Sequence, residues 1–135
     1  MSKSIKKLVR DFYNSDAYKN EEVMKSFLHP EVELHWSSSD GFIKLDFDGF
    51  VNLVSNLKNT YRSLRADISH VIREDDKVCV RYTYHVRTIE NPDEEMPLAH
   101  FMTIWEVKDG KLYRGYELSQ LADADPVNLA SYRKK

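Results

Sequence analysis

Glu117 and His100 are the side chains best placed for acid–base chemistry. They fall in two runs of alternating apolar and polar residues, 98–108 and 111–121, which Asp109-Gly110 separates. An Asp-Gly pair between such runs favours a two-residue type I′ hairpin turn, which sets the pairing of the strands. A regular hairpin pairs 107 with 112, 105 with 114, 103 with 116, 102 with 117 and 100 with 119. Glu117 and His100 would then share a face, within reach of one another across adjacent strands.

A carboxyl group on an apolar face loses hydration, which raises its pKa toward the range useful for general acid–base catalysis. We therefore expect Glu117 to act as acid or base on a carbonyl compound and His100 to orient it. Aromatic walls with polar tips orient guests in ligand pockets, so the substrate-binding residues are expected to be Trp36, Tyr82, Tyr84 and Met102. The alternative is a buried structural contact between His100 and Glu117, with the aromatic residues as ordinary core.

The opposite face of the same strands is rich in arginine and aromatic side chains. Such a composition is typical of an interface, and a symmetric dimer is the commonest way to cover it. The sequence predicts a homodimer through this outer sheet face, with an ordinary solvated face as the alternative. A register shift of one residue would exchange the two faces. The predicted interface residues are Arg81, His85, Trp105, Arg114 and Tyr116.

Helical periodicity precedes the strands. Residues 4–15 predict an amphipathic helix capped by Ser2 or Ser4, a shorter helix follows Asn20 and stops at His29-Pro30, and 48–61 predict a third. Strands are expected at 31–36, 65–73, 77–89, 98–108 and 111–121. Together these elements predict an α+β fold formed by one domain, 1–123. Residues 124–135 are expected to form a C-terminal tail, with a break at Asp125-Pro126 and a frayed end at 133–135.

The composition narrows the class of protein. A chain of 135 residues with 20 basic and 22 acidic side chains, a formal net charge of −2, has no basic footprint for nucleic acid and no polybasic membrane anchor. No apolar run approaches the length of a membrane span or a secretory signal, so a cytoplasmic protein is expected. The single cysteine, Cys79, excludes an internal disulfide. His70 lies on an apolar face as a lone histidine, and neither a metal nor a cofactor is predicted.

Two segments carry a resemblance to a known family. The run from Phe101 to Ser119 resembles the closing hairpin of the SnoaL-like (polyketide cyclase-like) branch of the nuclear transport factor 2-like superfamily, and so does the run from His29 to Leu34. The resemblance implies a cystatin-like α+β cone, with N-terminal helices packed on a curved antiparallel sheet that encloses a pocket, and a homodimer through the outer face. In the SnoaL-like cyclases an acidic residue on the last strand is a recurring pocket acid, and Glu117 falls at that position.

The ketosteroid isomerase branch of the superfamily has a different pattern. Its catalytic aspartate would fall at Trp36, its oxyanion-hole acid at Met102 or Thr103, and its first-helix tyrosine near Val9, so that chemistry is not expected. We expect an unknown small-molecule ligand. The favoured interpretation is a proton-transfer enzyme of isomerase, cyclase or hydrolase type using Glu117. The alternative is a non-catalytic binding or protein-interaction module whose cavity is plugged by Tyr82, Tyr84 and Met102.

Overall fold

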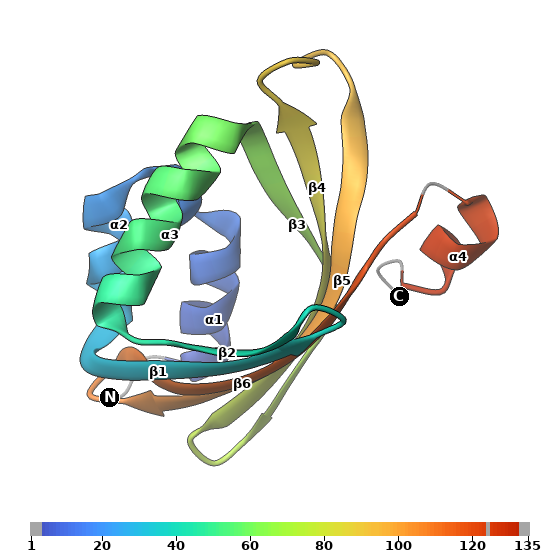
Figure 1. Cartoon of the computed structure of the whole chain (residues 1–135). Helices are drawn as coiled ribbons and strands as arrows, with labels where there is room; N and C mark the ends of the chain where they lie inside the picture. The colour runs from blue at the N-terminus through green and yellow to red at the C-terminus, as the bar shows by residue number, and fades with distance from the viewer. Residues whose placement is uncertain (1–3, 124, 133–135) are drawn as a thin grey trace.

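Three helices lie within the curve of a six-stranded sheet and a fourth lies on its outer side (Figure 1). The computed structural model describes residues 4–123 and 125–132. The strand order across the sheet is β2-β1-β6-β5-β4-β3. The elements are α1 (Ile5–Asn14), η1 (Ala17–Lys19), α2 (Glu21–Phe27), β1 (Leu28–Ser38), β2 (Gly41–Leu45), α3 (Phe47–Thr60), β3 (Tyr61–Glu74), β4 (Lys77–Thr88), β5 (Glu95–Lys108), β6 (Lys111–Leu121) and α4 (Pro126–Ala130).

Each of the helices α1, α2 and α3 begins directly after a residue whose side chain caps its N-terminus. Ser4 accepts from the backbone N–H of Lys7 at the start of α1, Asn20 caps α2 and Asp46 caps α3, so that each satisfies an amide that the first helical turn leaves free. Ser2, the alternative cap for α1, lies outside the described residues. The predicted helices 4–15 and 48–61 agree with α1 and α3 to within one residue at each end. Among the residues that the structure describes, no helix is long and apolar enough to cross a membrane.

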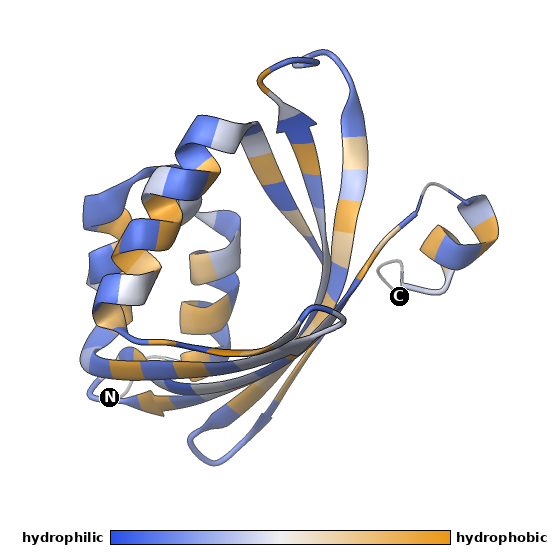
Figure 2. Ribbon diagram, in the orientation of Figure 1, coloured by the Kyte–Doolittle hydropathy of each residue, from blue (hydrophilic) through white to orange (hydrophobic). Residues whose placement is uncertain are grey.

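The sheet is mixed rather than purely antiparallel. β1 runs parallel to β6, whereas the other neighbouring strands are antiparallel. The short strand β2 was not predicted from the sequence, and four of its five residues are exposed, so it lacks the alternation of a half-buried strand. Figure 2 shows the alternation of apolar and polar residues along the long strands and the apolar side of α3 turned toward the sheet.

The β5–β6 hairpin departs from regular pairing just after its turn. Asp109 and Gly110 have φ of 55° and 71°, which the type I′ turn requires, and Val107 lies opposite Leu112 as predicted. The next pair is Glu106 with Arg114, so Tyr113 is an extra residue on β6. A bulge of one residue moves each later side chain of β6 to the face opposite to the one that regular pairing with β5 predicts. The predicted pairs 105 with 114, 103 with 116, 102 with 117 and 100 with 119 are therefore wrong.

This bulge corrects the predicted faces. Glu117 lies opposite Thr103, on the concave face that the helices cover, whereas His100 belongs to the outer face. The expected contact between Glu117 and His100 is therefore wrong. Trp105, predicted on the outer face, is 1% exposed and packs in the core beneath the helices. Met102, predicted in the pocket, is 44% exposed on the outer face.

Strand β4 turns its apolar residues inward as its alternation indicates. Val78, Val80, Tyr82 and Val86 are buried. Tyr82 lies opposite Phe101 and Val78 opposite Trp105, so the inward stripe joins the face of Glu117 and not that of His100. The main core lies between this concave face and α1, α2 and α3.

Candidate functional site

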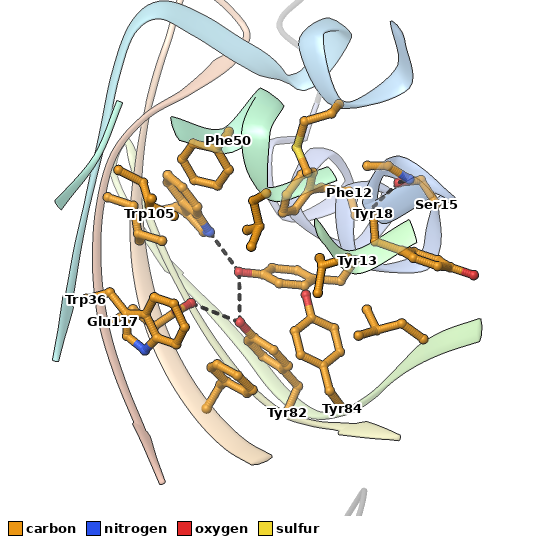
Figure 3. A pocket seen from close by; sticks show the side chains of 18 of the residues that line it. Phe12, Tyr13, Ser15, Tyr18, Trp36, Phe50, Tyr82, Tyr84, Trp105 and Glu117 are labelled. Atoms are coloured by element: carbon orange, nitrogen blue, oxygen red, sulfur yellow. Dashed lines mark hydrogen bonds between the residues drawn. The ribbon is translucent and has the colours of Figure 1, made fainter. Parts of the chain in front are cut away.

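A cavity of about 150 Å³ lies between the concave face of the sheet and the helices (Figure 3). α1 contributes Phe12 and Tyr13, α3 contributes Phe50, and β4 contributes Tyr82 and Tyr84. Much of the remaining lining is leucine and further aromatic side chains. Glu117 on β6 is the one acidic residue among the described residues that line the space. The cavity is thus an apolar, aromatic chamber with a carboxyl group in its wall.

The carboxyl of Glu117 is held by neutral hydroxyl groups. Thr103 donates to its Oε1 at 2.7 Å, and Tyr82 donates to the same oxygen at 3.0 Å. Both donors come from the neighbouring strands β5 and β4, so the pleat of the sheet fixes the position of the carboxyl. Both of these hydrogen bonds end on Oε1, which leaves Oε2 for a guest in the cavity.

Burial governs the acidity of this carboxyl. Removal from water disfavours the ionised form and raises the pKa of Glu117 to about 7, and the hydrogen bonds from Thr103 and Tyr82 oppose that rise in part. A group with this pKa exists in both protonation states near neutral pH. Glu117 is therefore suited both to take and to give a proton.

Tyr13 brings a second polar group to the same end of the cavity. Its hydroxyl accepts a hydrogen bond from Nε1 of Trp105 at 2.9 Å and lies 3.3 Å from the hydroxyl of Tyr82. Since Tyr82 has one hydroxyl hydrogen, its donation to Glu117 leaves the Tyr13 hydrogen free for Tyr82 or for a guest. Burial and the nearby Glu117 raise the pKa of Tyr13, so Tyr13 stays a neutral donor.

Gly115 makes room for the indole that holds Tyr13. It lies opposite Trp105 on the neighbouring strand, and a Cβ at this position would lie 2.8 Å from Cζ3 of Trp105 and 2.6 Å from Cδ1 of Leu34. Both distances are too short for carbon atoms that are not bonded to each other. The absence of a side chain at position 115 therefore lets the ring of Trp105 lie flat against β6.

Three of the four residues predicted to bind substrate lie in the cavity wall: Trp36, Tyr82 and Tyr84. Trp36 is fixed by donation from its Nε1 to Oγ of Ser119 at 2.8 Å. Tyr84 packs edge-on against Tyr82, with the ring centroids 5.0 Å apart. Met102, the fourth, lies on the other side of the sheet. The bulge in β6 is the physical reason for this difference, because the pocket was placed on the wrong face of β5.

His100 belongs to a separate outer hollow. Its Nδ1 lies 2.7 Å from Oγ1 of Thr83, and its ring packs against Tyr132 with centroids 4.6 Å apart. Burial, followed by the charge of Arg81, lowers the pKa of His100 and keeps the imidazole neutral. The sheet separates it from Glu117, so His100 cannot orient that carboxyl.

The sequence interpretation missed Tyr13 and Thr103. Tyr13 carried a usable signal, because it follows Val9 by four residues on the buried stripe of α1. The position expected for a first-helix tyrosine, Val9, is fully buried core. Thr103 could not have been found, because the regular hairpin register placed it on the face opposite to Glu117. Within 4–123 and 125–132, no three His, Cys, Asp or Glu side chains lie close enough to hold a metal ion.

Helices packed inside a curved sheet are the arrangement of the cystatin-like α+β cone. Comparison with protein families gives the more specific assignment: residues 9–115 match the SnoaL-like domain, so the chain belongs to the SnoaL-like family of the nuclear transport factor 2-like superfamily. No curated protein matches the sequence.

Solved structures of similar fold cover nearly the whole chain. IdmH of Streptomyces antibioticus, provisionally described as a polyketide cyclase, is 14% identical over 93% of this chain and 95% of its own, with a TM-score of 0.65. TerC, co-crystallised with polyporic acid, is 21% identical over 93% and 95% of the two chains (TM-score 0.60). A hypothetical protein of Catenulispora acidiphila with a ketosteroid isomerase-like fold, in complex with trimethylamine, is 9% identical over 93% and 91% (TM-score 0.63). At these identities the likeness establishes the fold.

Proposed function

We propose that the protein binds a compact organic molecule in the aromatic cavity and that Glu117 transfers protons to and from it, as in an isomerase or cyclase. The observation that carries this proposal is the position of one carboxyl, with a pKa of about 7, in the wall of an otherwise apolar chamber. Perturbed carboxyl groups in concave apolar sites are candidates for acid–base catalysis. The complexes of TerC with polyporic acid and of the Catenulispora protein with trimethylamine support the use of this fold to hold small molecules.

The volume of the cavity limits the size of the guest. Pockets for drug-sized ligands have volumes of about 300–1,000 Å³, whereas an apolar cavity of about 150 Å³ in another protein accepts a benzene ring. With about 150 Å³ available, the cavity fits a guest of about one ring. Trp36, Tyr82 and Tyr84 would form the walls around it, and the Glu117 carboxyl would contact its reacting end.

In the proposed step, Oε2 of ionised Glu117 takes a proton from the carbon next to a carbonyl group of the guest. The C–H bond breaks, an O–H bond forms on Glu117, and the electron pair moves to the carbonyl oxygen as an enolate. Tyr13 donates a hydrogen bond to that oxygen and stabilises its charge. Where the enolate is conjugated with a C=C bond, return of the proton to the far carbon of that bond isomerises the guest. In ring closure the enolate carbon attacks a second carbonyl of the same guest: a C–C bond forms, the π pair of that C=O moves to its oxygen, and the oxygen takes the proton back from Glu117.

Hydrogen–deuterium exchange on a one-ring ketone tests this proposal. Cyclohexanone in D₂O is followed by NMR, with and without protein, and we expect the protein to accelerate exchange next to the carbonyl, with a rate that rises with pH to a plateau above about 7. Glu117→Gln, verified to be folded, removes the acceleration. Glu74→Gln, on the exposed end of β3, is the matched control and retains it. Equal exchange by the wild type and Glu117→Gln would exclude Glu117 as the base.

The second candidate is a binding module without catalysis. The small volume favours it, because a cavity of about 150 Å³ lined by the rings of Tyr13, Tyr82 and Tyr84 leaves room for little more than one ring. Met102 does not belong to this lining, contrary to the predicted plug. A protein that binds the ketone, by calorimetry, and yet leaves its exchange rate unchanged belongs to this class.

A homodimer through the outer face of the sheet is part of the same proposal. Met102 lies opposite Leu118 and Ile104 opposite Tyr116, so these four residues form one apolar patch, with exposed fractions of 42–65%. A second copy related by twofold symmetry would cover the patch. Of the predicted interface residues, Tyr116 belongs to the patch, whereas Trp105 is in the core and Arg81 is engaged by Tyr132.

The proposal also covers the division of the chain and its location. We take 1–123 as the ligand-binding domain and 124–135 as a tail appended to it; the predicted frayed end at 133–135 lies outside the described residues. The single cysteine, Cys79, is consistent with a reducing compartment such as the cytoplasm. Fractionation of the source cells, with the protein detected by antibody, tests the location.

A further inference from the structure

We propose that the ligand of the cavity is a small alkylammonium cation, bound between aromatic ring faces with its charge next to the carboxylate of Glu117. This inference rests on the proposed use of the cavity as a ligand site, and it does not depend on the proton-transfer step. It specifies the charge of the ligand, whereas the size of the cavity limits only its volume.

The cavity wall contains a carboxyl group without a basic side chain to balance its charge. No lysine, arginine or histidine occurs among the described residues of the cavity wall. The carboxyl of Glu117 receives its hydrogen bonds from Thr103 and Tyr82, which are neutral. An ionised carboxylate in such surroundings is costly unless an opposite charge accompanies it. A cationic guest supplies that charge, whereas an anionic guest would add a second uncompensated negative charge whenever Glu117 is ionised.

The walls of the cavity favour a cation as well. The aromatic ring has a negative face, which attracts an alkylammonium ion, most strongly where both are removed from water. Trp36, Tyr13 and Tyr82 line the cavity together with Glu117 and lie near it in Figure 3. A neutral aliphatic guest would gain as much from leucine and valine walls as from these rings. The aromatic composition and the lone carboxylate therefore indicate the same class of guest.

The proton and the cation compete for the same carboxyl. Glu117 binds the cation when ionised, and the groups able to titrate that face it are Tyr13 from α1 and Tyr82 and Tyr84 from β4. Burial raises the pKa of each of these tyrosines, so they stay neutral and leave Glu117 as the group that changes charge near pH 7. Affinity for a permanent cation must then rise with pH until Glu117 is fully ionised.

A matched pair of ligands separates charge from shape. Choline and its uncharged carbon isostere, 3,3-dimethylbutan-1-ol, are titrated into the whole protein by calorimetry at pH 6 and pH 8.5. We expect choline to bind at least about tenfold more tightly than the isostere at pH 8.5. Its affinity should fall about tenfold at pH 6, because most Glu117 is then protonated. Affinity for the isostere should stay unchanged between the two pH values.

Two variants test the role of each part of the site. Glu117→Gln keeps the shape of the carboxyl, and it should abolish both the preference for choline and its dependence on pH. Trp36→Leu retains an apolar wall around Glu117, and it should weaken choline more than the isostere. This second variant keeps the inference testable if Glu117→Gln does not fold, because Trp36 is only half-buried. Glu74→Gln is the control for loss of an acidic group elsewhere.

The outcomes distinguish the inference from the proposed function. Isostere affinity equal to that of choline at pH 8.5 overturns the cationic ligand and leaves the cavity as a ligand site. No binding of either compound, with the protein folded, overturns the cationic ligand, and the exchange of cyclohexanone then decides whether the proposed function stands. A preference for choline over the isostere that persists in Glu117→Gln also overturns the inference, because the charge would then be bound elsewhere.

Discussion

Burial of Glu117 affects the stability of the fold. No basic side chain accompanies it in the cavity wall as far as the structure describes it, so folding brings a carboxyl into apolar surroundings without an ionic partner. Its pKa accordingly rises from 4.5 to about 7. Between these two values the folded chain holds a proton that the unfolded chain has released. The stabilisation from that bound proton is complete below about pH 4.5 and is lost as the pH rises through 7.

The free energy of unfolding should therefore fall between pH 5 and pH 8 because of Glu117. In Glu117→Gln this contribution is absent, and the wild-type value minus the variant value should decrease by about 2 to 3 kcal/mol over the interval. Urea unfolding at a series of pH values measures the difference. The same subtraction with Glu74→Gln should be flat. A flat difference for Glu117→Gln would mean that the carboxyl is hydrated in the folded state.

Gly115 allows a second prediction for a single residue. In Gly115→Ala the added methyl group would overlap Trp105 and Leu34, so the indole must move away from β6 and from the hydroxyl of Tyr13. We expect a loss of about 1–3 kcal/mol in the free energy of unfolding and a changed near-ultraviolet circular dichroism spectrum. Gly110→Ala, at φ +71° with open space around it, is the control. It should lose stability through backbone strain and leave the spectrum of the tryptophans intact.

At the scale of elements, most of the fold was predictable and one irregularity decided the site. The caps at Ser4 and Asn20, the Asp109-Gly110 turn and the period of each strand follow from local chemistry, so sequence patterns locate them. The extra residue at Tyr113 leaves no trace in the alternation of β6. The centroid of its ring lies 4.8 Å from that of the His29 ring and 4.0 Å from Cζ of Arg114. One of these contacts, with His29 of β1, is a tertiary contact that the sequence of the hairpin does not contain.

The C-terminal segment gives the prediction that belongs to an element. Tyr132 donates from its hydroxyl to the carbonyl oxygen of Phe101 at 2.7 Å, and the guanidinium of Arg81 lies 3.5 Å from the centre of its ring. Tyr132→Phe should cost about 1 kcal/mol through the lost hydrogen bond, and Tyr132→Ala more. In Tyr132→Ala the amides of α4 should also exchange faster by mass spectrometry. Tyr116→Phe, on the exposed outer face, is the control. If the amides of α4 exchange in Tyr132→Ala at the wild-type rate, other contacts hold the segment.

At the scale of the whole molecule, the curved sheet divides the chain into an inner face for a ligand and an outer face with an apolar patch. Leu118 is 65% exposed in that patch, beside Met102 and Tyr116. Such a patch on a monomer indicates an interaction surface. Leu118→Glu should therefore convert the proposed dimer into a monomer, with half the mass by light scattering, because the proposed interface would bury two glutamates. The side chain lies outside the core, so the stability of each subunit should change by less than about 0.5 kcal/mol.

Ile89→Glu, at a position 51% exposed just after β4, is the control for a surface charge elsewhere and should leave the mass unchanged. A wild-type protein that is monomeric at these concentrations, or a Leu118→Glu variant that remains dimeric, would show that the outer face of the sheet does not join the two subunits.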